Sequence, residues 1–289
     1  MTERTQDEKY LKKRKAHSFA LKALIWLCGI LTVGILVYIL LFILVRGIPN
    51  INMKFLFGQY DSETLSAFSS IIATIEIIVI SLAAALPIGV FCAIYLTEYA
   101  RRGNKAVKVI RLAVDTLAGI PSIVYGLFGM IFFVGILGFR TSVLSGICTV
   151  SIMILPVIIS SSEEAIKAVP DMYREGSLGL GATRLRTVFK IVLPTAMPGI
   201  LSGVILAIGR IVGESAALIF TSGTNVLKAP TLDLTASQRT LAIHMYMLAG
   251  EGLPHHRDMA FATGAILIII VFAVNMAATK LASKIGREQ

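Results

Sequence analysis

Six apolar stretches, each about as long as a membrane is thick, constrain this chain more than any other feature of its sequence. They cover residues 23–45, 67–96, 116–139, 141–162, 191–220 and 259–279. A helix needs roughly 20 apolar residues to cross the hydrocarbon core of a bilayer. Because 56% of the residues are hydrophobic and only 15% are charged, a soluble core could not hide this much apolar surface from water. We therefore predict an all-α membrane protein with six transmembrane helices.

The positions of the basic residues predict how these helices are oriented. The chain carries 27 Lys and Arg residues and a formal net charge of +10. Most of them lie in 1–22, 97–115, 163–190 and 280–289, and few lie in the other connections. Basic residues stay on the cytoplasmic side of a membrane, so we expect a cytoplasmic basic tail over 1–22 and both termini in the cytoplasm. We therefore attribute the net positive charge to orientation in membrane lipid, and we expect no nucleic-acid partner.

Several connections have patterns of their own. A tight turn around Gly138 and Arg140 separates the third and fourth stretches, which should therefore be antiparallel neighbours. In 97–115, residues Val107, Ile110 and Val114 recur at helical spacing, which fits a short amphipathic helix and equally a solvated basic loop.

The connection 221–258 is too long for a simple turn, so we expect it to fold over the outer mouth, with a helix over 237–248. Within it, His255, His256 and Asp258 suggest a metal, but their spacing fits no known site and favours a solvated loop.

The fifth stretch carries two charges inside the membrane. A helical spacing of three or four residues joins Gly199, Gly203, Ala207, Arg210, Glu214 and Ala217. On a continuous helix these residues share one face, where the small ones admit another helix and the two charges can meet. Charges at this depth line a pathway or pair with each other. Arg210 then either faces a route for an anion, whose oxygens suit a guanidinium, or locks two helices together. Glu76, in the second stretch, either pairs with Arg210 or lies near the outer interface.

Motifs for enzymatic chemistry are missing from the sequence. It has no nucleotide-phosphate loop of the form Gly-x-x-x-x-Gly-Lys and no His-Glu-x-x-His or Gly-x-Ser-x-Gly run. Cys28, Cys92 and Cys148 lie far apart inside apolar stretches and are interpreted as small hydrophobic residues. We therefore expect no enzymatic activity and no cofactor in this chain, so that any ATP and Mg²⁺ would be bound by a partner.

The connection 163–190 has a distinctive pattern. Pro170 and Asp171 are typical of a helix start, and Gly179 and Gly181 are typical of a break. These signals predict a short helix, a glycine turn and a second helix that re-enters the membrane.

In the same connection, Glu175 precedes Gly181 by six residues, and Ile191, Leu193 and Pro194 follow. This spacing resembles the EAA motif of bacterial ABC-importer permeases, with Gly176-Ser177 in place of the usual two alanines. In that family the loop forms a coupling helix that docks on an ATPase subunit. The resemblance assigns this coupling to Arg174, Glu175, Gly181 and Ala182.

Three further stretches, 86–99, 119–126 and 208–216, resemble the phosphate-specific transport permeases, which occur as two paralogous types. The runs 213–218 and 241–246 look more like the PstA type than the PstC type, although Ala217 replaces the usual proline. The resemblance covers 67–286 and implies a type I importer permease domain with the MetI-like fold. In the family, the positions matched by Arg210 and Glu214 are linked to phosphate passage. Glu76 is a further candidate for the translocation path, because it is a charge inside an apolar stretch.

The resemblance also implies partners and a location. A PstC-type permease, two PstB-type ATPase subunits and an external PstS-type phosphate-binding protein would complete an importer in the bacterial cytoplasmic membrane. The main hypothesis is therefore a PstA-type subunit of an ATP-driven phosphate importer. Alternatives are a PstC-type subunit, a permease for another oxyanion, a passive anion channel, a secondary carrier, or a membrane scaffold. A carrier would show inverted repeats, and a scaffold would not need Arg210 and Glu214 on a small-residue face.

Overall fold

The computed structural model describes the backbone of residues 2–100 and 103–287, and the side chains of residues 18, 19, 21–100 and 103–280. No strand occurs in these ranges, which confirms the all-α prediction. The long helices are α1 (Thr2–Gly47), α3 (Phe68–Ile94), α6 (Val143–Lys167), α9 (Leu193–Val212) and α12 (Pro254–Arg287). Five helical segments of the described chain can cross a membrane, and a bent pair makes a sixth.

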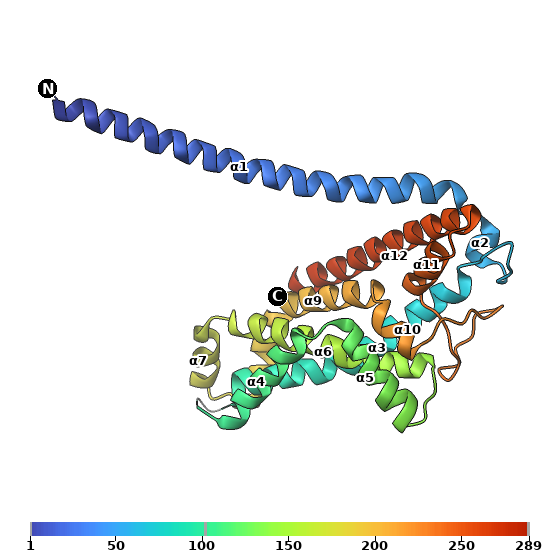
Figure 1. Ribbon diagram of the computed structural model, residues 1–289. Coiled ribbons are helices and arrows are strands. Elements are labelled where there is room, and N and C mark those ends of the chain that lie inside the picture. Colours follow the sequence, from blue (N-terminus) through green and yellow to red (C-terminus); the bar gives the residue numbers. More distant parts are fainter. Residues whose placement is uncertain (1, 101–102, 288–289) are drawn as a thin grey trace.

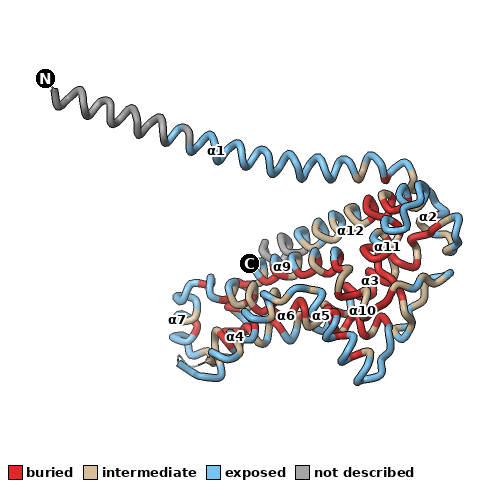
Figure 2. Tube along the Cα trace, in the orientation of Figure 1, coloured by how far each residue is buried: buried red, intermediate tan, exposed pale blue. Residues whose placement is uncertain are grey.

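The first helix, α1, extends away from the rest of the molecule (Figures 1 and 2). It runs without a break from the expected basic tail into the first span, so no boundary separates 1–22 from 23–45; the tail's side chains up to residue 17 lie outside the described residues. Its apolar segment is exposed along its length. The packing of α1 is concentrated near Gly47, which lies against Phe261 and Ala265 of α12. A 3-10 turn, η1 (Ile48–Asn50), follows.

Helix α6 is the centre of the bundle (Figure 2). Its Val150, Met153 and Ile154 are fully buried among apolar side chains of α3 and α9. Glycines bring the neighbouring helices close to it. A Cβ on Gly203 of α9 would lie 1.9 Å from Ser161 Oγ, and a Cβ on Gly199 would lie 2.6 Å from Ala165 Cβ. The prediction that the small residues of the fifth stretch admit another helix is confirmed, and that helix is α6.

The third predicted span begins in the wrong place. Residues 116–118 end α4 (Lys105–Ala118), and the chain then bends by 103° before α5 (Ser122–Gly129) and the π-helical turn η3 (Met130–Ile136). Pro121 cannot donate the hydrogen bond that would continue α4, and Gly119 ends that helix. The predicted turn before α6 is confirmed, because Gly138 and Arg140 have positive φ.

Helix α4 confirms the amphipathic prediction for 97–115 and excludes the solvated-loop alternative. Val114 is buried, and Val107 and Ile110 pack beside it against Leu96 and Ile159. These contacts join α4 to α6 and to the end of α3, which continues into the π-helical turn η2 (Tyr95–Tyr99).

The sequence predicted that the fifth stretch forms one continuous helix to residue 220, and this prediction is wrong. Helix α9 ends at Val212, and α10 (Ala216–Thr221) starts after a break. The buried carboxylate of Glu214 accepts the backbone N–H of Ala217 at 2.9 Å and so caps α10. Glu214 and Ala217 therefore do not share a helix face with Arg210. Spacing alone missed this, because Gly213 and a capping carboxylate interrupt the helix without disturbing its period.

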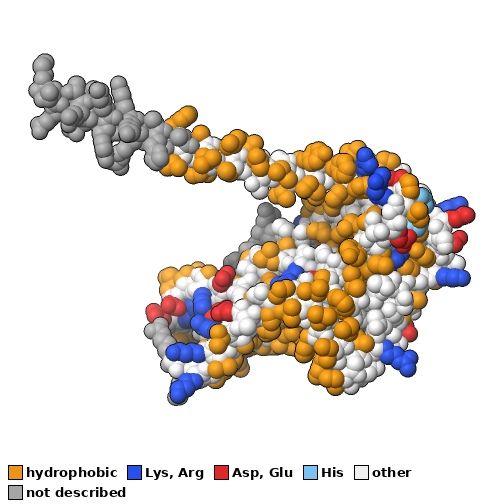
Figure 3. All heavy atoms as spheres, in the orientation of Figure 1, with side chains coloured by type: hydrophobic (Ala, Val, Ile, Leu, Met, Phe, Trp, Pro, Cys, Tyr) orange, Lys and Arg blue, Asp and Glu red, His pale blue; other side chains and the backbone are white. Residues whose placement is uncertain are grey.

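The bundle has two distinct ends (Figure 1). We call one the basic end: it holds α4, α7 (Asp171–Gly179) and α8 (Arg184–Thr187), and the outer tips of α1 and α12 lie on its side. The opposite end holds α2 (Met53–Phe57), α10 and α11 (Leu241–Gly250). Charged side chains gather at the two ends, whereas hydrophobic ones cover the flanks (Figure 3), as a membrane-spanning bundle requires.

The connection 221–258 folds back onto the opposite end of the bundle. Leu234 and Ala236 accept hydrogen bonds from the first backbone N–H groups of α6. The predicted helix over 237–248 is present as α11, shifted by a few residues. The solvated-loop interpretation of His255 and His256 is wrong, because both lie in the first turn of α12.

A substitution at Gly203 tests the close contact between α9 and α6. We expect Gly203→Val to lower the free energy of unfolding by about 1–3 kcal/mol, because the added methyl groups collide with Ser161. The measurement is thermal unfolding of the purified protein in detergent. Gly209→Val on the same helix is the matched control, since nothing lies within 4 Å of its Cβ position. Equal losses at both positions would contradict the packing assignment.

Candidate functional site

The connection between α6 and α9 forms an exposed helix at the basic end. Helix α7 begins after Pro170 and ends at Gly179, and Gly181 turns the chain with a φ of +83°. A hydrogen bond of 2.9 Å between the hydroxyls of Ser177 and Thr187 ties α7 to α8. The π-helical turn η4 (Val188–Val192) then leads into α9. The predicted helix, glycine turn and re-entering helix are thus confirmed.

Apolar side chains of this connection point outward at the basic end. Met172 is 72% exposed and Leu180 is 91% exposed. Tyr173 and Leu178 are also exposed, and Glu175 lies in the same helix. A cluster of exposed apolar side chains next to charged ones is typical of a protein-docking surface. Of the four residues expected to couple to an ATPase, Glu175 and Gly181 are exposed here, Ala182 is half-buried, and Arg174 points inward.

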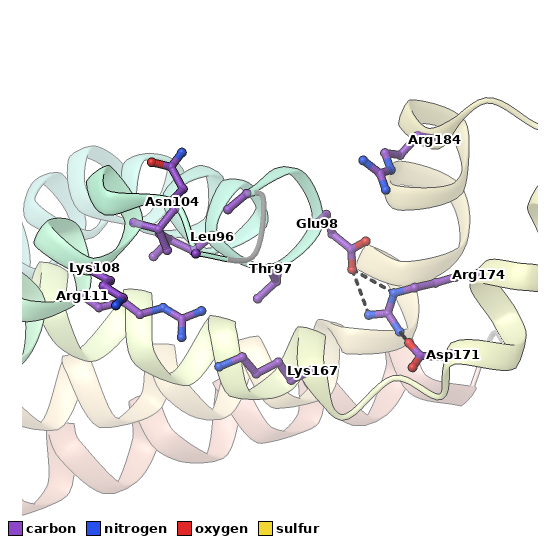
Figure 4. A pocket seen from close by; sticks show the side chains of 13 residues that line it. Leu96, Thr97, Glu98, Asn104, Lys108, Arg111, Lys167, Asp171, Arg174 and Arg184 are labelled. Atoms are coloured by element: carbon purple, nitrogen blue, oxygen red, sulfur yellow. Dashed lines mark hydrogen bonds and ion pairs between the residues drawn. The ribbon is translucent and has the colours of Figure 1, made fainter.

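Arg174 joins α7 to the ends of two spanning helices (Figure 4). Its Nε donates to Glu98 Oε1, which follows α3, at 2.9 Å. Its other nitrogens donate to the carbonyls of Ile166 and Val169, at the end of α6, at 2.8 and 2.6 Å, and to Asp171 at 3.0 Å. Only a planar guanidinium can serve so many acceptors at once. We call this set of bonds the Arg174 joint.

A second joint ties α4 to α6. The carboxylate of Glu163 lies 2.7 Å from both Arg111 of α4 and Lys167 of α6. Sequence reasoning missed Glu98 and Glu163 as joints, because the resemblance of 86–99 assigns no role to Glu98 and Glu163 lies in no motif. The available signal was position: each is a carboxylate at the end of a predicted span, next to a connection rich in basic residues.

Arg210 lies in the last turn of α9 and is partly exposed. It is roughly 25 Å along the helix from Leu193, at 1.5 Å per residue, and so lies toward the opposite end of the bundle. Among the described residues it forms no ion pair with Glu214 or Glu76.

Glu76 lies in α3 near the opposite end of the bundle. The residue is 8% exposed, and its Oε2 has no hydrogen-bond partner among the described residues. It borders a groove of about 480 Å³ whose other lining is apolar, including Leu232 and Leu234 of the returning connection. The predicted pair with Arg210 is not formed among the described residues, and a position at the outer membrane interface remains a prediction. The structure therefore places Arg210, Glu214 and Glu76 in separate environments, and their part in translocation remains a prediction.

The buried pair of Arg239 and His244 holds the returning connection to α3. Arg239 is 5% exposed, lies over the Tyr60 ring at 5.3 Å, and donates from Nε to His244 Nδ1 at 3.1 Å. Nδ1 is therefore an acceptor, and the Ser70 hydroxyl of α3 also donates to it at 3.2 Å. Burial, reinforced by Arg239, lowers the pKa of His244 to about 3. Neither residue stood out in the sequence, because a lone Arg and a lone His there suggested no contact.

Acidification tests this buried histidine. Its pKa is about 6.5 in the unfolded chain and about 3 in the folded protein. Below pH 6.5 the unfolded state binds an extra proton, so stability falls as the pH falls from 6.5 toward 3. We expect His244→Asn to lose less thermal stability between pH 7 and pH 4.5 than the wild type does. His255→Asn, which removes an exposed histidine, should keep the wild-type pH dependence; an unchanged profile for His244→Asn would contradict the pKa assignment.

Comparisons with known proteins agree on one family. Residues 85–287 match the family described as "Binding-protein-dependent transport system inner membrane component". The chain is 32% identical over 281 residues to the probable ABC transporter permease protein YqgI of Bacillus subtilis, which covers 91% of this chain and 94% of that protein. It is 36% identical over 200 residues to the phosphate transport system permease protein PstA 1 of Mycobacterium tuberculosis, covering 68% of this chain and 64% of the relative. The protein PstA of Pasteurella multocida is 29% identical over 255 residues, with coverage of 88% and 86%.

Solved structures show the same fold. A bacterial ABC transporter that imports the acidic polysaccharide alginate contains a chain with a TM-score of 0.62 and 15% identity, covering 97% of this chain and 99% of that one. The inward-facing MetNI methionine ABC transporter contains a chain with a TM-score of 0.57 and 20% identity, and the match covers 85% of this chain and 97% of that one. These likenesses confirm the predicted MetI-like permease fold of ABC importers.

Proposed function

Because this chain belongs to the family of binding-protein-dependent transport system inner membrane components, we propose that it is the PstA-type permease subunit of an ATP-driven importer of inorganic phosphate. Several relatives named as phosphate transport permeases, which are 29–36% identical to this chain, support inorganic phosphate as the substrate. One observation supports the proposed coupling between the ATPase and the spanning helices. The exposed helix α7 is bonded through the Arg174 joint to the ends of two spanning helices.

The subunit is a translocation component, as its homologues are, and ATP hydrolysis belongs to separate subunits. We propose two PstB-type ATPase subunits, one of which docks on the exposed face of α7, a homologous PstC-type permease, and an external PstS-type phosphate-binding protein. The basic end would face the cytoplasm, since basic residues are retained there, with the complex in the bacterial inner membrane. The exposed apolar surface of α1 fits a subunit that is covered by lipid and a neighbouring permease.

Movement of the ATPase subunits would pass through α7. When they close on ATP, they displace α7, and the Arg174 joint transmits the displacement to the ends of α3 and α6. Apolar contacts support this path, because Val188 and Val192 are buried with Ala93, Ile94 and Ile166. Packed interiors transmit strain well because they contain few voids. The spanning helices then move as units between an outward-open and an inward-open arrangement.

Arg210 would contact the passing anion. An arginine deep in the apolar belt is costly unless it faces water or a partner, and this one is partly exposed with no ion pair to Glu76 or Glu214 in the described chain. A guanidinium presents a fork of donors that matches phosphate oxygens. Contact must stay weak enough for release. The alternative of a locked structural pair with Glu214 has less support, because the Glu214 carboxylate caps α10 instead.

Neutralising Arg210 tests the pathway. We expect Arg210→Gln to lower phosphate uptake by the reconstituted complex about 10- to 100-fold, because it removes a charge-assisted contact worth about 1.5–3 kcal/mol. Assembly should be unaffected, as judged by co-purification of all subunits. Arg140→Gln is the control, since it removes an exposed arginine from the turn before α6 and should leave uptake intact. Normal uptake by Arg210→Gln would refute the pathway role.

The Arg174 joint is tested with a substitution that keeps the charge. Arg174→Lys retains the cation but cannot reach Glu98, Ile166 and Val169 together. We expect ATP hydrolysis by the complex to persist while phosphate uptake per ATP falls at least about tenfold. The matched control is Lys190→Gln, which removes an exposed charge from the same connection. An unchanged ratio of uptake to hydrolysis in Arg174→Lys would rule out transmission through this joint.

A further inference from the structure

A cavity of about 680 Å³ lies at the basic end, between the end of α3, helix α4, the last turn of α6 and α7. Figure 4 shows Lys108 and Arg111 on one side of it and Arg184 on the other. Leu96 and Val107 supply apolar lining next to the spanning helices. The cavity therefore lies where the membrane surface meets the connections at this end.

Cationic side chains from four segments of the chain converge on this cavity. They are Lys108, Arg111, Lys167, Arg174 and Arg184. Two carboxylates also line it, Glu98 and Asp171, and both are bonded to Arg174.

The remaining cations are only partly balanced. Arg111 and Lys167 share the single carboxylate of Glu163. Lys108 and Arg184 form no ion pair within the described part of the chain. About two positive charges in the cavity therefore lack a counter-charge from this subunit.

The backbone adds to this positive potential. Helix α4 has 14 residues and starts at Lys105, directly after Gly103 and Asn104, which line the cavity. The Asn104 side chain caps the N–H of Ala106 at 2.9 Å. The positive end of the helix dipole thus lies at the cavity, where it favours an anion.

We infer that this cavity binds a phosphate-bearing anion, held by the cations that line it, Lys108 of α4 and Arg184 of α8 among them. Guanidinium and ammonium groups are the side chains that hold phosphate oxygens best, and a phosphate group supplies negative charge that the cavity lacks. The group has two possible sources, the headgroup of an anionic phospholipid or free inorganic phosphate. The exposed Val109 and Leu112 of α4, at 65% and 68%, put a lipid surface next to the cavity.

Occupancy would stiffen the basic end. The cavity is bordered by Arg174 and Arg111, which make the two joints of α7 and α4 with the spanning helices. A bound anion would add charge-assisted contacts to the cations that border the cavity. Binding here is independent of which ion is transported and does not involve Arg210.

Binding to the assembled complex tests the site. In one arm, nanodiscs contain phosphatidylcholine with phosphatidylglycerol, and native mass spectrometry counts the phosphatidylglycerol retained per complex. In the other arm, the discs contain phosphatidylcholine alone, and binding of radiolabelled inorganic phosphate is measured. The variant is K108Q/R184Q. The control is K105Q/R186Q, which removes one charge from each of the same two helices at positions that do not line the cavity.

We expect K108Q/R184Q to bind at least about tenfold more weakly than the wild type, and K105Q/R186Q to match the wild type. A loss in the phosphatidylglycerol arm identifies the lipid headgroup as the source, and a loss confined to the inorganic phosphate arm identifies free phosphate. Equal binding by the two double variants in both arms would overturn the site. Since the readout is binding, a failed uptake prediction for Arg210→Gln would leave this result intact, and the converse also holds.

Discussion

Lipid offers no hydrogen bonds, and this constraint shapes the whole molecule. Every backbone polar group inside the bilayer must be satisfied by the chain itself, so the spans are helices and their hydroxyl side chains turn back on the helix. Thr74 donates to the Ser70 carbonyl at 2.7 Å and Ser161 to the Val157 carbonyl at 2.6 Å. Charges move to the two ends for the same reason, which makes Arg210, Glu214 and Glu76 exceptions that require a specific role. Glu214 has one that is visible, since its carboxylate replaces the missing backbone acceptor at the start of α10.

Close packing and charged joints have different parts in this architecture. Small residues set the distance between α9 and α6, so the two helices share a dense apolar contact with no room for independent movement. At the basic end, helices are joined instead through guanidinium and carboxylate groups. Such contacts are directional and can be rearranged without opening the core. The packed contacts keep the membrane-spanning helices together, and the charged contacts allow the connections at the basic end to move.

The sequence predicted most of the fold, and its failures have physical causes. Hydropathy located the spans because twenty apolar residues in a row have few other solutions. Proline and glycine signals located α7 because they act locally. The bend before α5 and the break before α10 were missed because the apolar pattern runs through both. In the structure, the missing N–H of Pro121 and the capping carboxylate of Glu214 interrupt the helices. The contacts of Glu98 with Arg174, of Glu163 with Arg111 and of His244 with Ser70 were missed because these partners are distant in sequence, which no local pattern encodes.

The contact between α1 and α12 has a consequence for biogenesis. Phe42 and Phe261 meet edge to face at 5.6 Å, and Gly47 lies against Ala265. Helix α1 thus has its main neighbour in α12, which follows it by more than 200 residues in the sequence. Contacts between distant segments form late. Helix α1 therefore remains without this neighbour in the lipid until α12 has been synthesised and can pack against it.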